Sequence, residues 1–419
     1  MMPLSDSVSM EHESSPTNDT HTESDTQSAS STVVYNHEPY DTFQHIVRSF
    51  AKHDLWPDGV AEDITVDRLS GGSFNRIIGL GYNGTRYILR IPRFDSAELC
   101  RDVAILEFLQ QHTQLPVPRI EKYDETPDNK LGLPYMVQDR IDGVDLYSSF
   151  SDLDDEKRCQ VARELGHVFH QMLATRTNVA GHFSYSKDCS HEPFHITPFH
   201  STHPIAYCDR PATQTTLELL ESSFQAQKAV HMNDSITVLS NLVDQLGAMA
   251  SELGAGGWLT DIPNCIAHLD LAPRNILINP NAQGHIISSI LDWDSAVSAP
   301  SFMACSPPFW LWAWEDYHED EWIVKDTPST PQGHKLKRLF EKAAGEKYMQ
   351  FASKPKYRLA RQLVQFAIDG VQSNEAFKEA KAMLQEWDAI KEEKKPTVLN
   401  YLDSLTKWVW HRIQLLASG

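Results

Sequence analysis

The residues most able to do chemistry lie in residues 268–275, which read His-Leu-Asp-Leu-Ala-Pro-Arg-Asn, and in a later Asp-Trp-Asp at 292–294. Asp270 supplies a carboxylate that can orient a hydroxyl group and accept its proton. Asn275 offers a neutral amide oxygen, and Asp292 offers a charged oxygen. Mg²⁺ favours a few protein oxygens completed by phosphate and water. The spacing of these three residues therefore predicts transfer of a phosphoryl group from ATP with magnesium.

Apolar segments adjoin each part of this set and are expected to fix its position. Residues 276–279 and 286–293 are expected to form a short hairpin that connects the two acidic motifs. Asp292 follows the apolar strand residues 289–291. His268 is interpreted as a hydrogen-bonding residue of the loop rather than as a base.

A glycine turn between two expected strands could contact phosphate groups. Gly71, Gly72 and Ser73 separate a strand at residues 64–70 from a strand at 75–82. Backbone N–H groups can approach an anion closely where there is no Cβ. Glycine turns are also common in ordinary hairpins, so this feature is open to both interpretations.

A third strand at residues 85–92 follows the turn signal Asn-Gly at positions 83–84. It contains Arg90 among apolar residues, where a cation needs a partner or a ligand because burying it alone is costly. The sequence favours a contact between Arg90 and ATP phosphates, with Asp102 or Glu98 of the helix at 97–110 as its partner. A guanidinium that emerges into solvent at the sheet edge is the alternative.

The order of the elements predicts an α+β chain with two lobes. Residues 1–35 are polar and acidic and are expected to be a disordered tail. Residues 40–143 are expected to form a small β-rich N-lobe that binds the nucleotide. Residues 144–419 are expected to form a larger, mainly helical C-lobe that carries the catalytic loop and the helices of the acceptor site. Within it the pattern is helical from residue 152, and further helices are expected at 235–253, 335–349, 356–372, 374–394 and 399–416. Residues 177–214 are rich in His, Pro, Ser and Thr and are expected to be irregular.

The formal net charge is 37 − 57 = −20, which argues against a nucleic-acid partner and against an electrostatic membrane anchor. An acidic protein could attract a cationic acceptor, although a solvated acidic surface is the simpler interpretation. No secretory signal or membrane-length apolar run is evident, and the six cysteines are scattered. These features predict a cytoplasmic protein, and they leave its oligomeric state open.

The chain resembles the aminoglycoside phosphotransferase and choline kinase-like family, and in particular its fungal phosphotransferase-like branch. The resemblance runs from about residue 66 to residue 311 and rests on the order and spacing of several segments: 71–75, 87–90, 115–118, 136–143, 165–170, 268–277 and 291–294.

This resemblance implies a bilobal protein-kinase-like fold with ATP between the lobes. It implies that Asp270 is the catalytic acid/base, that Asn275 and Asp292 bind Mg²⁺, and that the backbone at Asp139 and Ile141 meets adenine. The acceptor would be a hydroxyl of a small molecule such as an amino sugar, an amino alcohol or a secondary metabolite.

Three positions depart from the family pattern. Leu269 stands where a glycine is usual, Arg90 where a lysine is common, and Asp102 where a glutamate is expected. These departures favour a second hypothesis, a catalytically silent nucleotide-binding pseudokinase or scaffold. A protein kinase is a weaker alternative, because the Asp-Phe-Gly and Ala-Pro-Glu landmarks are not recognised.

Overall fold

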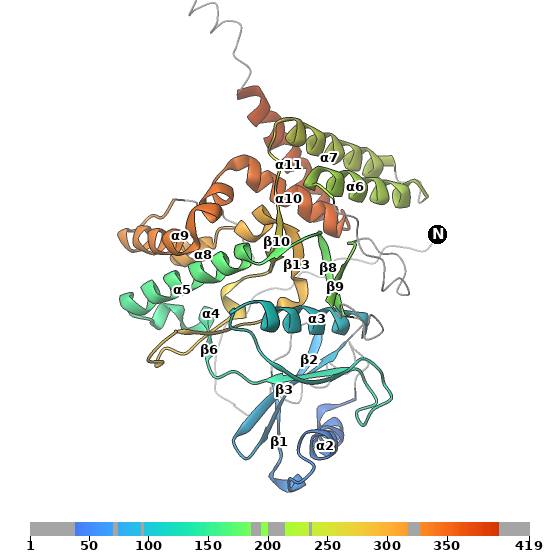
Figure 1. The fold of residues 1–419 in the computed structure, drawn as a ribbon, viewed down its shortest axis with the longest axis vertical. Coiled ribbons are helices and arrows are strands. Elements are labelled where there is room, and N and C mark those ends of the chain that lie inside the picture. Colours follow the sequence, from blue (N-terminus) through green and yellow to red (C-terminus); the bar gives the residue numbers. More distant parts are fainter. Residues whose placement is uncertain are drawn as a thin grey trace, which may run out of the picture. The chain divides into compact units, whose positions relative to one another are not determined.

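The structure is a computed structural model that describes residues 38–69, 74–93, 96–185, 194–199, 214–233, 237–316 and 327–393. The chain divides into two compact units (Figure 1). The first comprises residues 1–94 and 126–135, and the second comprises residues 95–125 and 136–419. The expected lobe boundary at residue 143 stays a prediction; in this division residues 95–125 and 136–143 belong to the second unit.

The first unit is built on three antiparallel strands, β1 (Thr65–Arg68), β2 (Asn75–Tyr82) and β3 (Thr85–Pro92). The β2–β3 turn is Asn83-Gly84, whose φ angles of 49° and 82° are both positive. Asparagine and glycine tolerate this conformation better than other residues do, which explains why the sequence alone located the hairpin. The strand limits at 75–82 and 85–92 are those predicted.

Helix α2 (Tyr40–Phe50) packs against one face of this sheet. Its buried residue Phe43 lies under the guanidinium of Arg76, 4.2 Å from the ring centroid. Arg90 is paired with Ile77 in the strand register, so it lies on the opposite face from Arg76, which is paired with Ile91. Helix α2 therefore covers the Arg76 face of the sheet and not the Arg90 face.

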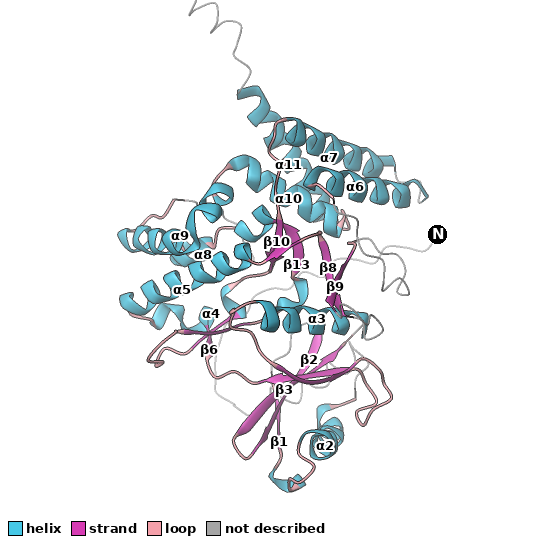
Figure 2. Ribbon diagram, in the orientation of Figure 1, coloured by secondary structure: helices cyan, strands magenta, loops and turns pink. Residues whose placement is uncertain are grey.

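The second unit is mainly helical (Figure 2). Its core helix α5 (Asp155–Ala174) packs along α9 (Pro331–Ala352), and the two lie side by side in Figure 1. Gly166 permits this close approach, because a Cβ there would lie 2.5 Å from the carbonyl oxygen of Phe340. The other helices of this unit are α3 (Ser96–His112), α4 (Leu146–Ser149), α6 (Thr216–Asn233), α7 (Thr237–Ala255), α8 (Phe309–Trp312), α10 (Pro355–Asp369) and α11 (Asn374–Glu393).

Two small sheets of the second unit frame the loop at 268–275. One has the order β7-β10-β13-β8-β9, and the other has the order β12-β11-β6. Their strands are β6 (Val144–Asp145), β7 (Arg176–Thr177), β8 (Gly181–Tyr185), β9 (Phe194–Thr197), β10 (Asn264–Ala267), β11 (Ile276–Ile278), β12 (Ile287–Ile290) and β13 (Val297–Pro300). The strands β4 (Ile120–Asp124) and β5 (Tyr135–Asp139) precede them. The loop thus leaves β10 of one sheet and enters β11 of the other.

The predicted α+β class is confirmed, and so are the predicted helices at 97–110, 235–253, 335–349 and 374–394 and the hairpin of β11 and β12. Residues 177–214 were expected to be irregular, which is wrong for β8 and β9. Strand β8 pairs with β9 and, on its other side, with the distant strand β13, so a partner far along the chain orders this segment. The expected tail at 1–35 and helix at 399–416 lie outside the described residues. Among the described helices, none has the length and apolar character needed to cross a membrane.

Candidate active site

The loop at 268–275 is folded by its own backbone. The N–H of Ala272 donates to the carbonyl of Asp270 at 3.0 Å, and the N–H of Asn275 donates to the carbonyl of Ala272 at 3.0 Å. Pro273 then begins a short 3₁₀ turn that ends at Asn275. Proline suits this first helical position because its missing N–H would have no partner there. The loop therefore presents Asp270 and Asn275 from one tight turn.

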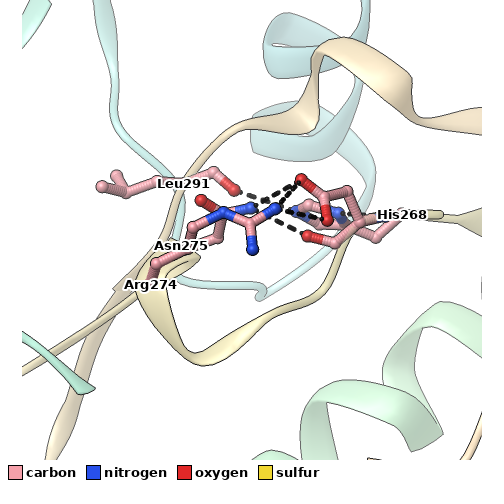
Figure 3. A network of polar contacts seen from close by, with 5 residues as sticks. His268, Arg274, Asn275 and Leu291 are labelled. Atoms are coloured by element: carbon pink, nitrogen blue, oxygen red, sulfur yellow. Dashed lines mark hydrogen bonds and ion pairs between the residues drawn. The ribbon is translucent and has the colours of Figure 1, made fainter. Parts of the chain in front are cut away.

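His268 joins this loop to the chain segment that follows β12. Its Nδ1 accepts a hydrogen bond from the N–H of Asp270 at 3.3 Å. Since a backbone N–H can only donate, the ring proton is on Nε2, which donates to the carbonyl of Leu291 at 2.9 Å (Figure 3). The ring is buried against Trp293, with centroids 4.5 Å apart, and burial lowers the pKa of His268. A neutral imidazole with both nitrogens hydrogen-bonded supports the structural interpretation of His268.

The carboxylate of Asp270 is held by two donors. Arg274 places Nη2 2.9 Å from both carboxylate oxygens, and Asn275 places Nδ2 3.1 Å from Oδ2 (Figure 3). The same Nδ2 donates to the backbone carbonyl of Asp270 at 2.8 Å. The Asp270 side chain is nevertheless 40% exposed, so it can meet a substrate.

These contacts also fix the amide of Asn275. Its side chain is buried, and its nitrogen is turned toward Asp270. The amide oxygen is therefore the atom that remains for a cation. A hard cation such as Mg²⁺ accepts a neutral oxygen of this kind.

Asp292 lies close to this loop because the preceding residue, Leu291, is hydrogen-bonded to it. The N–H of Leu291 donates to the carbonyl of Asn275 at 2.8 Å, and the carbonyl of Leu291 accepts from His268. Asp292, which follows Leu291 directly, is exposed and has left-handed backbone angles, φ 61° and ψ 52°. The structure thus brings together the segments that carry Asp270, Asn275 and Asp292.

Oxygens from Asn275 and Asp292 would be a sparse set for a metal. Within the described ranges, no group of three or more His, Cys, Asp or Glu side chains is arranged to hold a metal ion. The donor set present suits Mg²⁺, which keeps several water or phosphate ligands, better than it suits a metal that needs an all-protein cage. The residues fit the implied ion on this ground.

Leu269 shows how the loop accommodates a residue other than glycine. Its φ of 63° lies in the left-handed region, which a residue with a Cβ adopts at a cost of about 1–2 kcal/mol. The half-buried side chain packs against the hydrophobic core. The loop therefore keeps a glycine-like conformation, with part of the strain offset by packing.

The remaining predicted site residues are distributed over both units. Arg90 is buried in β3 of the first unit, and Asp102 is buried in α3 of the second. Asp139 ends β5, and its N–H donates to the carbonyl of Arg119 at 2.8 Å. Ile141 follows in a half-buried position. Gly71, Gly72 and Ser73 lie outside the described residues.

Arg274 is the residue that the sequence reasoning missed. Its signal was present, because Asp270 and Arg274 are four positions apart and opposite in charge. That spacing is meaningful when the intervening residues coil, as they do here through Pro273. The sequence predicts a loop at this place, and a loop does not by itself indicate a pairing between positions four apart.

Comparisons with known proteins show the family to which this chain belongs. The profile of the family described as "Phosphotransferase enzyme family" matches residues 65–302. Two curated relatives from Aspergillus fumigatus strains, both named subtelomeric hrmA-associated cluster protein, are 22% identical over 311 residues. The match covers 58% of this chain and 60% of each relative, so the chain spans about three fifths of their length.

Several solved structures are similar to this chain at low sequence identity. A ternary complex of aminoglycoside phosphotransferase APH(4)-Ia with AMP-PNP and hygromycin B is 18% identical and has a TM-score of 0.47, with 84% of this chain and 99% of that chain covered. The ADP-bound aminoglycoside phosphotransferase APH(2'')-Ib is 12% identical, with a TM-score of 0.49 and coverage of 81% and 96%. The family profile extends over more than half of the chain and includes the loop at 268–275 and the segment at 292–294. This chain therefore belongs to the phosphotransferase enzyme family and has its bilobal, kinase-like fold.

Proposed function

We propose that this protein is an ATP-dependent phosphotransferase that acts on a hydroxyl group of a small molecule. The observation that carries the proposal is the Asp270 carboxylate, which is partly exposed and held by Arg274 and Asn275 at 2.9–3.1 Å. A fixed carboxylate beside a candidate magnesium site is the arrangement that transfer of a phosphoryl group to an alcohol needs. Membership of the phosphotransferase enzyme family supports the same reaction class.

The reaction would proceed by direct transfer. The hydroxyl oxygen attacks the γ-phosphorus of ATP, and a new O–P bond forms as the bond to the β-γ bridging oxygen breaks. The hydroxyl proton goes to the Asp270 carboxylate, and ADP leaves with the electron pair of the broken bond. The backbone N–H of Asp270 donates to Nδ1 of the neutral His268. Because this hydrogen bond occupies the lone pair of that nitrogen, the histidine does not serve as the base.

The nucleotide would be held by the other predicted residues. Magnesium, when bound, would neutralise phosphate charge, and Asn275 and Asp292 would hold it through oxygen atoms. Arg90 would contact phosphates with Asp102 as its partner, and the turn at 71–73 would add backbone N–H groups. The N–H of Asp139 already donates to Arg119, so adenine would meet the carbonyl of Asp139 and the backbone of Ile141.

The acceptor is proposed as a small molecule such as an amino sugar, an amino alcohol or a secondary metabolite. The net charge of −20 would favour the approach of a cationic acceptor over a long distance. The similar solved structures include a complex with hygromycin B, which is a property of that protein. We propose a cytoplasmic location, as expected from the sequence.

The test is ADP release from magnesium-ATP by the full chain, measured with a panel of amino sugars and amino alcohols and with water alone as acceptor. Asp270→Asn should reduce turnover by ~100-fold or more, the range expected when a general base is lost. Asp128→Asn, an exposed aspartate outside the site, is the matched control and should leave turnover unchanged. Equal turnover in native protein and Asp270→Asn would refute the assignment.

A second measurement separates the alternative hypothesis. If ATP raises the melting temperature of the native chain but no ADP is released with any acceptor, the protein is a silent nucleotide-binding pseudokinase. The left-handed Leu269 is the feature that motivates this comparison, because a strained catalytic loop could bind nucleotide without turning over.

A further inference from the structure

Arg274 makes a contact that the proposed reaction would have to respect. Its Nη2 lies 2.9 Å from Oδ1 and 2.9 Å from Oδ2 of Asp270. The two side chains are 43% and 40% exposed. An ion pair this exposed contributes little to the stability of the fold. Its effect on the site is therefore the direction in which it holds the Asp270 carboxylate.

The contacts differ between the two carboxylate oxygens of Asp270. Oδ2 accepts from Arg274 at 2.9 Å and from Asn275 at 3.1 Å, whereas Oδ1 accepts from Arg274 only, within the part of the chain that the structure describes. Each carboxylate oxygen has about two lone-pair sites. Oδ2 is therefore saturated, and Oδ1 keeps one site for a further donor.

Without Arg274 the carboxylate of Asp270 would keep only its contact with Asn275, which involves one oxygen. The torsion that rotates a carboxylate about its last carbon–carbon bond is broad and has no sharp preference of its own. Asn275 alone grips one oxygen and leaves the carboxylate plane free to turn about that contact. A hydroxyl would then find the accepting lone pair in the right direction only part of the time.

We propose that Arg274 is a positioning residue for phosphoryl transfer, which fixes the carboxylate of Asp270 so that Oδ1 receives the hydroxyl proton of the acceptor. This inference rests on the proposed function and adds a residue and an atom to it. The guanidinium acts through Asp270. One nitrogen, Nη2, contacts both oxygens, and the planar guanidinium fixes its direction, which the rotatable ammonium of a lysine reproduces less well.

Kinetics of the full chain test the role of Arg274, with magnesium-ATP and water or the best acceptor of the panel. Arg274→Ala should lower kcat by about 10- to 100-fold, the effect of losing one charge-assisted hydrogen bond, while KM for ATP stays within about twofold. The kcat of Arg274→Lys should fall between that of the native chain and that of Arg274→Ala. Millimolar guanidinium chloride should restore part of the lost kcat in Arg274→Ala. Arg163 is an exposed arginine of α5. The control variant Arg163→Gln should keep the native kcat, and guanidinium chloride should not raise it.

The contrary outcomes are distinct. Unchanged kcat in Arg274→Ala, a loss confined to KM, or absence of guanidinium rescue would overturn the positioning role. If the native chain itself releases no ADP, the proposed function fails, and a measurement without turnover decides the pair. Labelling with carbodiimide and glycine ethyl ester, mapped by mass spectrometry, should modify Asp270 several-fold faster in Arg274→Ala than in the native chain, with Asp128 as reference. Equal rates would overturn the pairing.

Discussion

Replacing Leu269 by glycine and by alanine tests whether the catalytic loop is strained. At most positions glycine is less stable than alanine by about 0.5–1 kcal/mol, because it loses more backbone entropy on folding. At φ 63° alanine pays about 1–2 kcal/mol for its Cβ, and glycine does not. The difference of these terms makes Leu269→Gly more stable than Leu269→Ala by about 0.5–1 kcal/mol.

The comparison of two variants removes the effect of the lost side chain. Both delete the half-buried leucine that packs on the core, so that contribution cancels between them. Leu271, which is half-buried in the same loop and is absent from the positive-φ residues, provides the matched pair. There the glycine variant should be the less stable one by about 0.5–1 kcal/mol.

Equilibrium urea unfolding followed by tryptophan fluorescence measures these differences. The predicted result is opposite signs for the glycine–alanine difference at positions 269 and 271. If alanine is as stable as glycine, or more stable, at position 269, the left-handed conformation of Leu269 is wrong. The loop would then not have the glycine-like backbone described above.

Three further predictions concern the parts that support the site. Gly166→Val should lower the melting temperature strongly, since its Cβ would meet the carbonyl of Phe340 at 2.5 Å; a thermal melt equal to that of the native chain would contradict the α5–α9 packing. Glu164→Gln should cost about 1–2 kcal/mol in urea unfolding, because the carboxylate accepts the N–H of Ile287 at 2.9 Å, and an unchanged midpoint would refute that contact. Burial lowers the pKa of His268, so protonation of this histidine favours the unfolded state. The stability that the neutral His268 contributes is present above the ordinary pKa of about 6.5, and it is lost as pH falls toward the lower pKa of the folded state. The slope of unfolding free energy below pH 6.5 should be smaller in His268→Gln, and equal slopes would argue against a neutral histidine.

The local elements were predictable because neighbouring residues determine them. The β2–β3 hairpin follows from Asn83-Gly84, which tolerates positive φ at both turn positions. Helix α5 follows from apolar residues at helical spacing and from the cap of Asp154, whose side chain accepts from the N–H of Lys157. In each case the deciding interaction spans a few residues, so it can be found by inspection of a short window.

Elements with distant partners were not predictable in the same way. Strand β8 pairs with β13, and Gly181 lies opposite Ser298 more than a hundred positions later. Nothing in residues 177–214 indicates such a partner, because the pairing energy belongs to both strands. The irregular composition of this stretch therefore led to the wrong expectation.

The sequence by itself determined the order and spacing of Asp270, Asn275 and Asp292, and that spacing predicts which groups the candidate site contains and what chemistry they would do. The tertiary structure decided how those groups are held. His268 is tied to Leu291, 23 positions away, and the turn at Pro273 brings Arg274 onto the Asp270 carboxylate. Hydrogen bonds depend on direction and on distances of about 3 Å, and the fold sets both.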